Sequence, residues 1–330
     1  MKGSITPMIR NRRILVTALA AGLVLLTSIP GRSDSGGIPN ENAKGYWTQD
    51  RMANAIAIEL VVDEKTGIGK IQPAAARKGG STSTSTSIST SDWPQNAPIA
   101  QTAVGKVFFS DGISDYVCSG ALVQESNIDR AIVLTAGHCV WDQVKQVYYQ
   151  KWVFVPNYDS NTKNPAYPAS KLVVQKEFAD QGSFNSIALR NDWAFAILPD
   201  SDAIKSQGAY PLVFTSYAPN ELSVAYGYPQ AKPFNGLTLK YAAAPIFFDS
   251  KNANTTIGMS SSMTGGASGG PWVRSSECTK ALLTNTALCY GQSGSIASLN
   301  SYKYGNDNSK MYGPIFNSST SATFELAKTS

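Results

Sequence analysis

From about residue 102 onward, short apolar runs alternate with clusters of Gly, Asn, Asp and Pro. Runs of this length, rich in β-branched and aromatic residues and bounded by turn residues, are typical of β-strands. They occur at 103–109, 119–124, 131–135, 147–155, 193–198, 211–215, 222–227, 237–247, 271–274 and 295–304. Because long helical periods are missing, the pattern predicts an all-β protein, barrels or a sandwich, without a C-terminal helix.

The N-terminus has the pattern of an export signal. Lys2, Arg10, Arg12 and Arg13 precede an apolar run of 16 residues, 14–29, that ends in Pro30-Gly31. This order predicts a signal peptide over residues 1–31. An uncleaved signal anchor is the alternative, since the length of the run is just below that needed to span a membrane. We therefore expect a secreted, extracellular protein without stable membrane association after signal removal.

Residues 32–95 lack sustained strand alternation and end in Gly79-Gly80 followed by a Ser/Thr repeat. Such a tract has little to bury, so we predict a propeptide that ends in a flexible linker over 32–95. Thr48 or Asp50 can cap a short helix that includes Met52. The remaining chain is predicted to form two domains, 96–205 and 206–330.

The net charge of +5 does not indicate a nucleic-acid-binding protein. Residues 1–95 carry four of the five excess positive charges, which leaves the predicted folded part at +1. Binding to phosphates needs clustered Lys and Arg, and the second part of the sequence has no such cluster. We expect protein or peptide partners, no nucleic acid, and a monomer.

The four cysteines fall into two groups that are close in sequence. In an exported protein this favours disulfides. Three pairings are possible, and the simplest joins Cys118 to Cys139 and Cys278 to Cys289. A zinc site is disfavoured because the spacings lack a CxxC pattern and the chain has one histidine. We expect no metal.

The single histidine, His138, follows the apolar run 131–135 and a turn of two small residues, Ala136-Gly137. A lone histidine is more often structural than catalytic. Here the turn can present the imidazole at the end of a strand, and the adjacent Cys139 can hold the turn in place. His138 is therefore the candidate general base.

Ser268 lies in a glycine-rich segment, Thr264-Gly265-Gly266-Ala267-Ser268-Gly269-Gly270. Glycines permit backbone angles that aim two amide groups at one point, so the amides of Gly266 and Ser268 can form an oxyanion hole beside the Ser268 hydroxyl. A flexible turn is the alternative. An α/β-hydrolase elbow requires a histidine after the serine, whereas the only histidine lies 130 residues before Ser268.

A third residue must orient the histidine, and several acidic residues lie between His138 and Ser268. Asp192 stands directly before the apolar run 193–198, where its carboxylate would be partly buried and would need a partner. The alternative is an ordinary Asn-Asp turn residue. Asp192 is therefore the candidate.

Four segments together resemble, in order and type, the signature segments of the chymotrypsin-like (trypsin-like) serine peptidases. They are CSGAL at 118–122, TAGHC at 135–139, NDWA at 191–194 and GASGGP at 266–271. The resemblance covers about residues 97–330 and is closest to the microbial secreted branch that includes the glutamyl endopeptidases. It implies two antiparallel six-stranded β-barrels, with the substrate in the cleft between them. His138 and Asp192 would lie on the first barrel and Ser268 on the second.

Two positions depart from the family pattern. Trypsin-like zymogens use an aspartate before the nucleophile to bind the new N-terminus, and this chain has Ala267 there. The glutamyl endopeptidases use a second histidine for the substrate glutamate, and this chain has none. The predicted substrate pocket contains Ser262, Met263, Asn300, Ser301 and Tyr302, while Lys303 or Lys310 could attract an acidic side chain.

The sequence thus predicts a secreted serine endopeptidase, made as a zymogen, that needs no cofactor. Two alternatives use the same residues: a catalytically silent homologue that binds partners, and an esterase. Asn254 and Asn317 begin possible glycosylation tripeptides.

Overall fold

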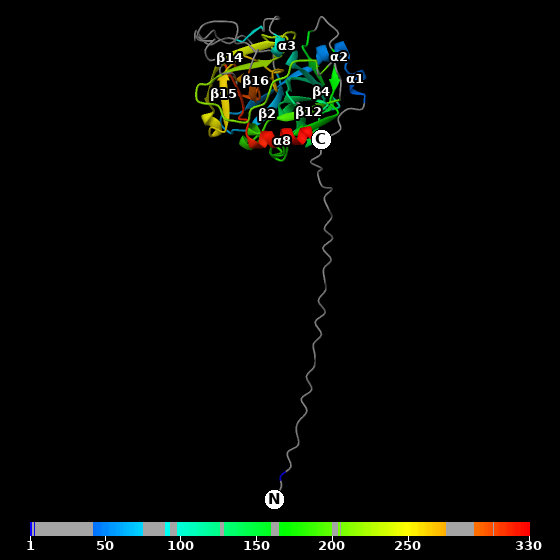
Figure 1. Cartoon of the computed structure of the whole chain (residues 1–330). Helices are drawn as coiled ribbons and strands as arrows, with labels where there is room; N and C mark the ends of the chain where they lie inside the picture. The colour runs from blue at the N-terminus through cyan, green and yellow to red at the C-terminus, as the bar shows by residue number, and fades with distance from the viewer. Residues whose placement is uncertain are drawn as a thin grey trace. The chain divides into compact units, whose positions relative to one another are not determined.

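The computed structural model describes residues 1, 3, 42–74, 90–92, 98–125, 129–159, 165–199, 204, 206–274, 294–305 and 307–330. This part is mostly β-structure with a few short helices (Figure 1), so the all-β prediction is confirmed at this level. The predicted signal peptide falls almost entirely outside the described residues, as does most of the Ser/Thr-rich linker.

A first antiparallel series of strands lies between residues 104 and 198. It contains β4 (Val104–Ser110), β5 (Asp115–Val123), β6 (Ala131–Thr135), β9 (Gln150–Pro156), β10 (Tyr167–Pro168), β11 (Lys171–Val174) and β12 (Ala194–Leu198). Neighbouring strands follow the order β10, β9, β4, β5, β6, β12, β11. Every residue of β4 and β12 is buried, which explains why these runs are almost continuously apolar.

A second antiparallel series lies between residues 222 and 314. It contains β13 (Leu222–Gly227), β14 (Lys240–Phe248), β15 (Thr256–Ser260), β16 (Pro271–Arg274), β17 (Ser295–Leu299), β18 (Tyr302–Tyr304) and β19 (Lys310–Pro314). The order is β17, β16, β13, β14, β15, β19, β18, and the short β3 (Ser91–Asp92) adds to β14. The predicted strand at 211–215 is wrong, because Leu212 makes only an isolated bridge with Ile296.

The remaining elements are short connections around these series. They are α3 (Pro98–Ala103), η1 (Gly137–Cys139), β7 (Trp141–Asp142), β8 (Val147–Tyr148), α4 (Lys176–Ala179), α5 (Ser186–Arg190) and η2 (Ser250–Asn252). Strands β7 and β8 pair as a small hairpin. Within the described part of the chain, no helix has the length and apolar character to cross a membrane.

The region predicted as a propeptide contains two helices and a β-hairpin. Helix α1 spans Ala43–Tyr46 and α2 spans Gln49–Asn54, with the Thr48 side chain accepting a bond from the Arg51 amide. The predicted cap and short helix are confirmed. Because the region lacks strand alternation, we expected no strands in it. This expectation is wrong, because β1 (Ile56–Val62) and β2 (Gly69–Pro73) pair with each other.

Strand β1 connects the two series. Its first residues pair in parallel with β5, Ile56 opposite Tyr116, and its last residues pair in parallel with β18, Leu60 opposite Tyr302. The sequence of β1 reads IAIELVV, a nearly continuous apolar run. It was missed because a strand buried on both faces shows no alternation.

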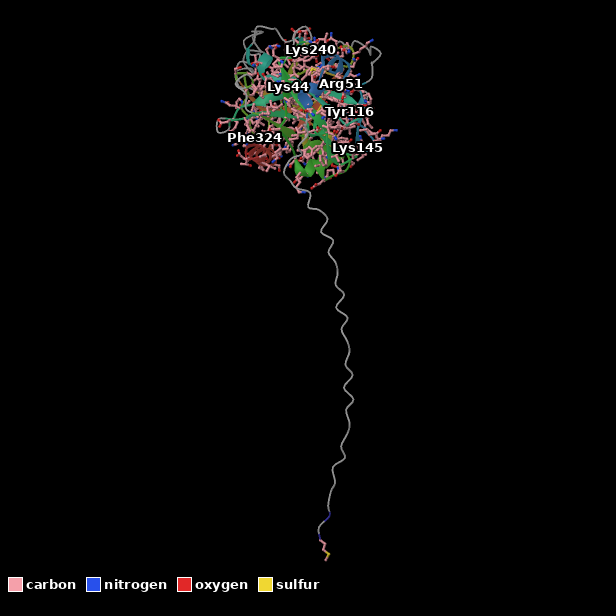
Figure 2. All side chains as sticks on the ribbon, turned by 90° about the vertical axis from the view of Figure 1, so that its right-hand side faces the viewer. Lys44, Arg51, Tyr116, Lys145, Lys240 and Phe324 are labelled. Atoms are coloured by element: carbon pink, nitrogen blue, oxygen red, sulfur yellow. A yellow bond between two sulfur atoms is a disulfide. The ribbon has the colours of Figure 1, made fainter. Side chains whose placement is uncertain are left out.

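The helices before β1 dock on the first series. The Trp47 ring lies 5.4 Å from the Phe108 ring of β4, and Arg51 forms an ion pair with Asp115 over 2.6 Å. Figure 2 labels Arg51 close to Tyr116 of β5. Figure 1 shows α1 and α2 side by side at this edge. These contacts, together with the pairings of β1, fix residues 43–73 onto the surface that carries the candidate site.

The chain ends in a helix, α8 (Ser318–Lys328), so the prediction of no C-terminal helix is wrong. Asn317 and Thr320 form a reciprocal capping box at its start. The Phe324 ring lies 5.2 Å from Phe195 of β12, which anchors the helix on the first series. The helix contains five Ser and Thr residues, and these weak helix formers concealed it in the sequence.

Candidate active site

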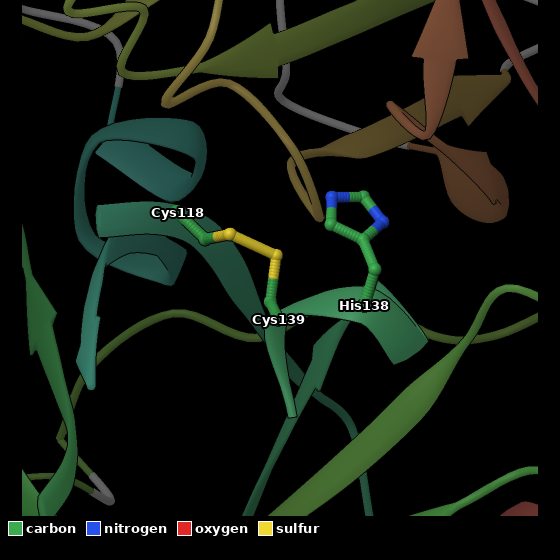
Figure 3. Close-up of side chains that lie close together, drawn as sticks. All are labelled: Cys118, His138 and Cys139. Carbon is green, nitrogen blue, oxygen red and sulfur yellow. A yellow bond between two sulfur atoms is a disulfide. The ribbon is translucent and has the colours of Figure 1, made fainter. Parts of the chain in front are cut away.

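His138 is placed by the end of β6 and by a disulfide. The strand ends at Thr135, and the chain then forms η1, which contains the histidine. Cys139 is bonded to Cys118 of β5, as predicted, and Figure 3 shows the imidazole beside this disulfide. The predicted partner pair, Cys278 and Cys289, lies outside the described residues.

Asp192 holds the histidine through both carboxylate oxygens. Its Oδ1 accepts a hydrogen bond from the His138 backbone amide over 2.8 Å, and its Oδ2 lies 2.7 Å from His138 Nδ1. Both side chains are completely buried. This arrangement places the Nδ1 proton toward the carboxylate, so the neutral ring carries its lone pair on Nε2.

Ser301 completes the contacts of this carboxylate. Its hydroxyl donates to Asp192 Oδ2 over 2.5 Å. Sequence analysis assigned Ser301 to the substrate pocket, whereas the structure places its hydroxyl against the residue that orients His138. Only the folding of the chain reveals this contact, because 109 residues separate the two side chains.

The Ser268 loop is held by glycines in conformations that other residues rarely adopt. Gly266 and Gly269 have φ angles of 97° and 81°. A Cβ at Gly269 would lie 2.4 Å from the Ser119 carbonyl oxygen and 2.8 Å from the Ala136 nitrogen. The loop therefore fits closely against β5 and the turn before His138 only because residue 269 has no side chain.

Ser268 and His138 lie on segments that contact each other. The Ser119 amide donates to the Ser268 carbonyl oxygen over 2.7 Å, and Ser119 directly follows Cys118 of the disulfide. The hydroxyl of Ser119 donates to the Gly266 carbonyl over 2.9 Å. Among the described residues, buried His138 Nε2 has no hydrogen-bond partner. In the part of the chain that the structure describes, Nε2 therefore forms no hydrogen bond with the Ser268 hydroxyl either.

Strand β1 covers this region. The Gly266 amide, a predicted oxyanion-hole donor, donates to the carbonyl oxygen of Ile58 over 3.2 Å. In the presence of this strand Ser268 is only 6% exposed and His138 is 0% exposed. Both side chains are therefore nearly closed to solvent in this structure.

The other residues predicted for the substrate pocket lie mainly in the interior. Met263, Asn300 and Tyr302 are fully buried, and Ser262 is half-buried. Asn300 accepts a bond from Trp272 Nε1 and donates to the carbonyls of Tyr226 and Ala267. Tyr302 donates to Asp249, and burial, with a smaller contribution from that carboxylate, raises the pKa of Tyr302 well above its usual value.

One group of potential metal-ligand atoms occurs among the described residues. Ligand atoms of Cys118, His138 and Cys139 lie within 4.8 Å of one another. Because the two sulfur atoms are bonded together, they are not thiolates and cannot act as zinc ligands. The group is better explained as the support of the His138 turn.

Comparison with known proteins identifies the family of this chain. Residues 79–304 match the family model described as lysyl endopeptidase, C-terminal domain. The chain belongs to this family. It is therefore a trypsin-like serine peptidase by descent, and the resemblance stated from the four sequence segments is confirmed. A comparison with curated protein sequences finds no match.

Solved structures of serine proteases are similar to this chain. The thermostable serine protease AL20 from an extremophilic microorganism is 32% identical, with 72% of this chain and 100% of that chain covered and a TM-score of 0.59. The protease Anisep from Arthrobacter nicotinovorans is 30% identical, with 73% and 100% covered and the same TM-score of 0.59. A Glu endopeptidase at 15% identity and a TM-score of 0.55, with 73% and 97% covered, shares the fold.

Proposed function

We propose that the chain is an exported serine endopeptidase in which Ser268 is the nucleophile, His138 the general base and Asp192 the residue that orients the base. One observation carries the proposal. The carboxylate of Asp192 binds both the backbone amide and Nδ1 of His138 in a fully buried position. A histidine fixed in this tautomer beside a serine on a glycine-rich turn fits the requirements of nucleophilic catalysis.

The reaction follows from the protonation states. Nε2 of His138 takes the hydroxyl proton of Ser268 as the serine oxygen attacks the peptide carbonyl, and the developing oxyanion accepts bonds from the Gly266 and Ser268 amides. The tetrahedral intermediate then collapses, the amine leaves with the proton from His138, and an acyl-enzyme remains. Water, deprotonated by His138, attacks this ester and regenerates the Ser268 hydroxyl.

The two strand series suggest how a substrate would be placed. We assign them to the two β-barrels that the family resemblance implies, with the substrate groove between them where β1 now lies. The bond from the Gly266 amide to the Ile58 carbonyl supports a covering role, since β1 uses a donor that catalysis needs. The chain would then be a zymogen, exported through its N-terminal signal as a monomer and activated by displacement of residues 56–73.

Labelling with a fluorophosphonate, which reacts with activated serines, tests this proposal. The full-length chain is labelled before and after limited proteolysis, and casein hydrolysis is followed in parallel. We expect slow labelling of the intact chain, rapid labelling and casein cleavage after processing, and neither in Ser268→Ala. A processed chain that takes no label and cleaves no casein would contradict the proposal. Rapid labelling of the intact chain would contradict only the covering role of β1.

A further inference from the structure

Lys303 lies close to the candidate catalytic residues. It is the central residue of β18, two positions after Ser301, whose hydroxyl binds Asp192. The edge of β18 is occupied by β1, with Val61 opposite Lys303. A peptide that bound along this edge would pass the Lys303 side chain immediately beside the catalytic residues.

The Lys303 ammonium group is buried against one carboxylate of β1. Its Nζ lies 3.7 Å from Glu59 Oε1, and the two side chains are only 1% and 5% exposed. Of the lysine and arginine ion pairs in the described part of the chain, this is the one in which both side chains are less than a tenth exposed. A buried ammonium without an anionic partner is costly, so Glu59 neutralises a charge that would otherwise disfavour this packing.

Glu59 belongs to a part of the chain outside the family match. The match begins at residue 79, after β2 has ended at Pro73. Lys303 lies within the match and stays with the catalytic part, whereas displacement of the hairpin removes Glu59. The peptidase would then carry the Lys303 charge at the edge of its groove, and the Glu59 carboxylate that lies against it in the intact chain would be gone.

We propose that Lys303 is a specificity-determining residue that binds an acidic side chain of the substrate, at the position that Glu59 occupies in the intact chain. This inference rests on the proposed function. Glu59 directly follows Ile58, whose carbonyl oxygen accepts the Gly266 amide. The preferred acidic residue should therefore lie within about two positions of the cleaved bond, and a carboxylate should be favoured over its amide isostere by about tenfold or more.

The test compares cleavage of peptides that differ in one group. A peptide library carries Glu or Gln at one position at a time, and kcat/KM is measured with the processed chain, normalised to the number of serines that take up fluorophosphonate. The variants are Lys303→Met, which keeps the length without the charge, and Lys303→Arg, which keeps the charge. Lys251→Met is the matched control, because Lys251 pairs with Glu64 of the same hairpin in a half-exposed position.

We expect a Glu preference in the wild type, in Lys303→Arg and in Lys251→Met, and a Glu/Gln ratio near 1 in Lys303→Met. The inference is overturned if the Glu/Gln ratio of Lys303→Met equals that of the wild type, or if the wild type shows no Glu preference. Either result leaves the peptidase assignment intact. If Lys303→Met takes up no label, Lys303→Gln is measured in its place. A processed wild type that neither takes up label nor cleaves any peptide overturns the proposed function itself.

Discussion

The hydroxyl of Ser301 and Nδ1 of His138 share one oxygen of Asp192, at 2.5 Å and 2.7 Å. The other oxygen accepts the backbone amide of His138. With its oxygens occupied in this way, the carboxylate cannot rotate away from the imidazole without losing these hydrogen bonds. Ser301 therefore positions Asp192, whereas Asp192 contacts His138 directly.

This difference in roles predicts unequal effects on catalysis. Asp192→Asn should lower kcat about 10³- to 10⁴-fold, because an amide can no longer select the required tautomer. Ser301→Ala removes one hydrogen bond to a charged group and should lower kcat by roughly 10- to 100-fold with little change in KM. Steady-state kinetics on each variant, scaled to the labelled fraction, measures both. Equal losses in the two variants would contradict the separate roles.

The buried pair between Glu59 and Lys303 predicts that charge removal loosens β1. In the intact chain, Glu59→Gln removes the carboxylate that lies 3.7 Å from the buried Lys303 ammonium, so Ser268 should react with fluorophosphonate at least about fivefold faster. Glu64→Gln is the control, since its ion pair with Lys251 is half-exposed and weak. It should change the labelling rate less than about twofold. Identical rates in the two variants would mean that the pair does not hold β1 in place.

Lys106 predicts an unusual dependence of stability on pH. Complete burial lowers the pKa of this lysine to about 7 from an ordinary value of 10.5. Its Nζ donates to Gln230 Oε1 and to the Gly236 carbonyl, which a neutral amine with two protons can also do. Between these two pKa values the unfolded chain binds one more proton than the folded chain, so the contribution of this group to stability rises with pH.

We expect that contribution to change by about 1.4 kcal/mol for each pH unit above 7. Lys106→Met should abolish it, so the unfolding free energy of the wild type minus that of the variant should increase as the pH rises from 7 to 9. Urea unfolding of the intact chain at several pH values measures this difference. A difference independent of pH would show that Lys106 stays charged in the fold.

The contact between Asp192 and His138 could be predicted better than the surroundings of the site. Short segments of unusual composition can be interpreted from the local sequence alone. Examples are the glycines around Ser268, which permit unusual backbone angles, and the turn of small residues before His138. Ser301 was placed near the site for a different role, since a serine carries no local sign of a partner 109 residues away. The buried positions of Asn300 and Tyr302 likewise depend on contacts between distant strands.

In the fold outside the site, too, features set by the local sequence could be predicted, whereas features set by tertiary contacts could not. The cap at Thr48 correctly predicted helix α2, and the apolar runs at 131–135 and 193–198 correctly predicted β6 and β12, because local patterns determine these elements. Strand β1 and helix α8 were missed for opposite reasons: the strand is an almost continuously apolar run that is mostly buried, and the helix is rich in Ser and Thr. Each becomes stable through tertiary contacts, which override local propensity.

The disulfide between Cys118 and Cys139 predicts a combined effect on stability and activity. It closes a loop with a sequence separation of 21 residues, so replacing both cysteines by alanine should lower the unfolding free energy by about 3 kcal/mol. It also ties the turn of His138 to β5, beside the strand residue Ser119 that binds the Ser268 carbonyl. We therefore expect slower labelling of Ser268 in the processed double variant, even at temperatures where circular dichroism shows it fully folded. A lower melting temperature with an unchanged labelling rate would mean that the bond stabilises the fold without positioning His138.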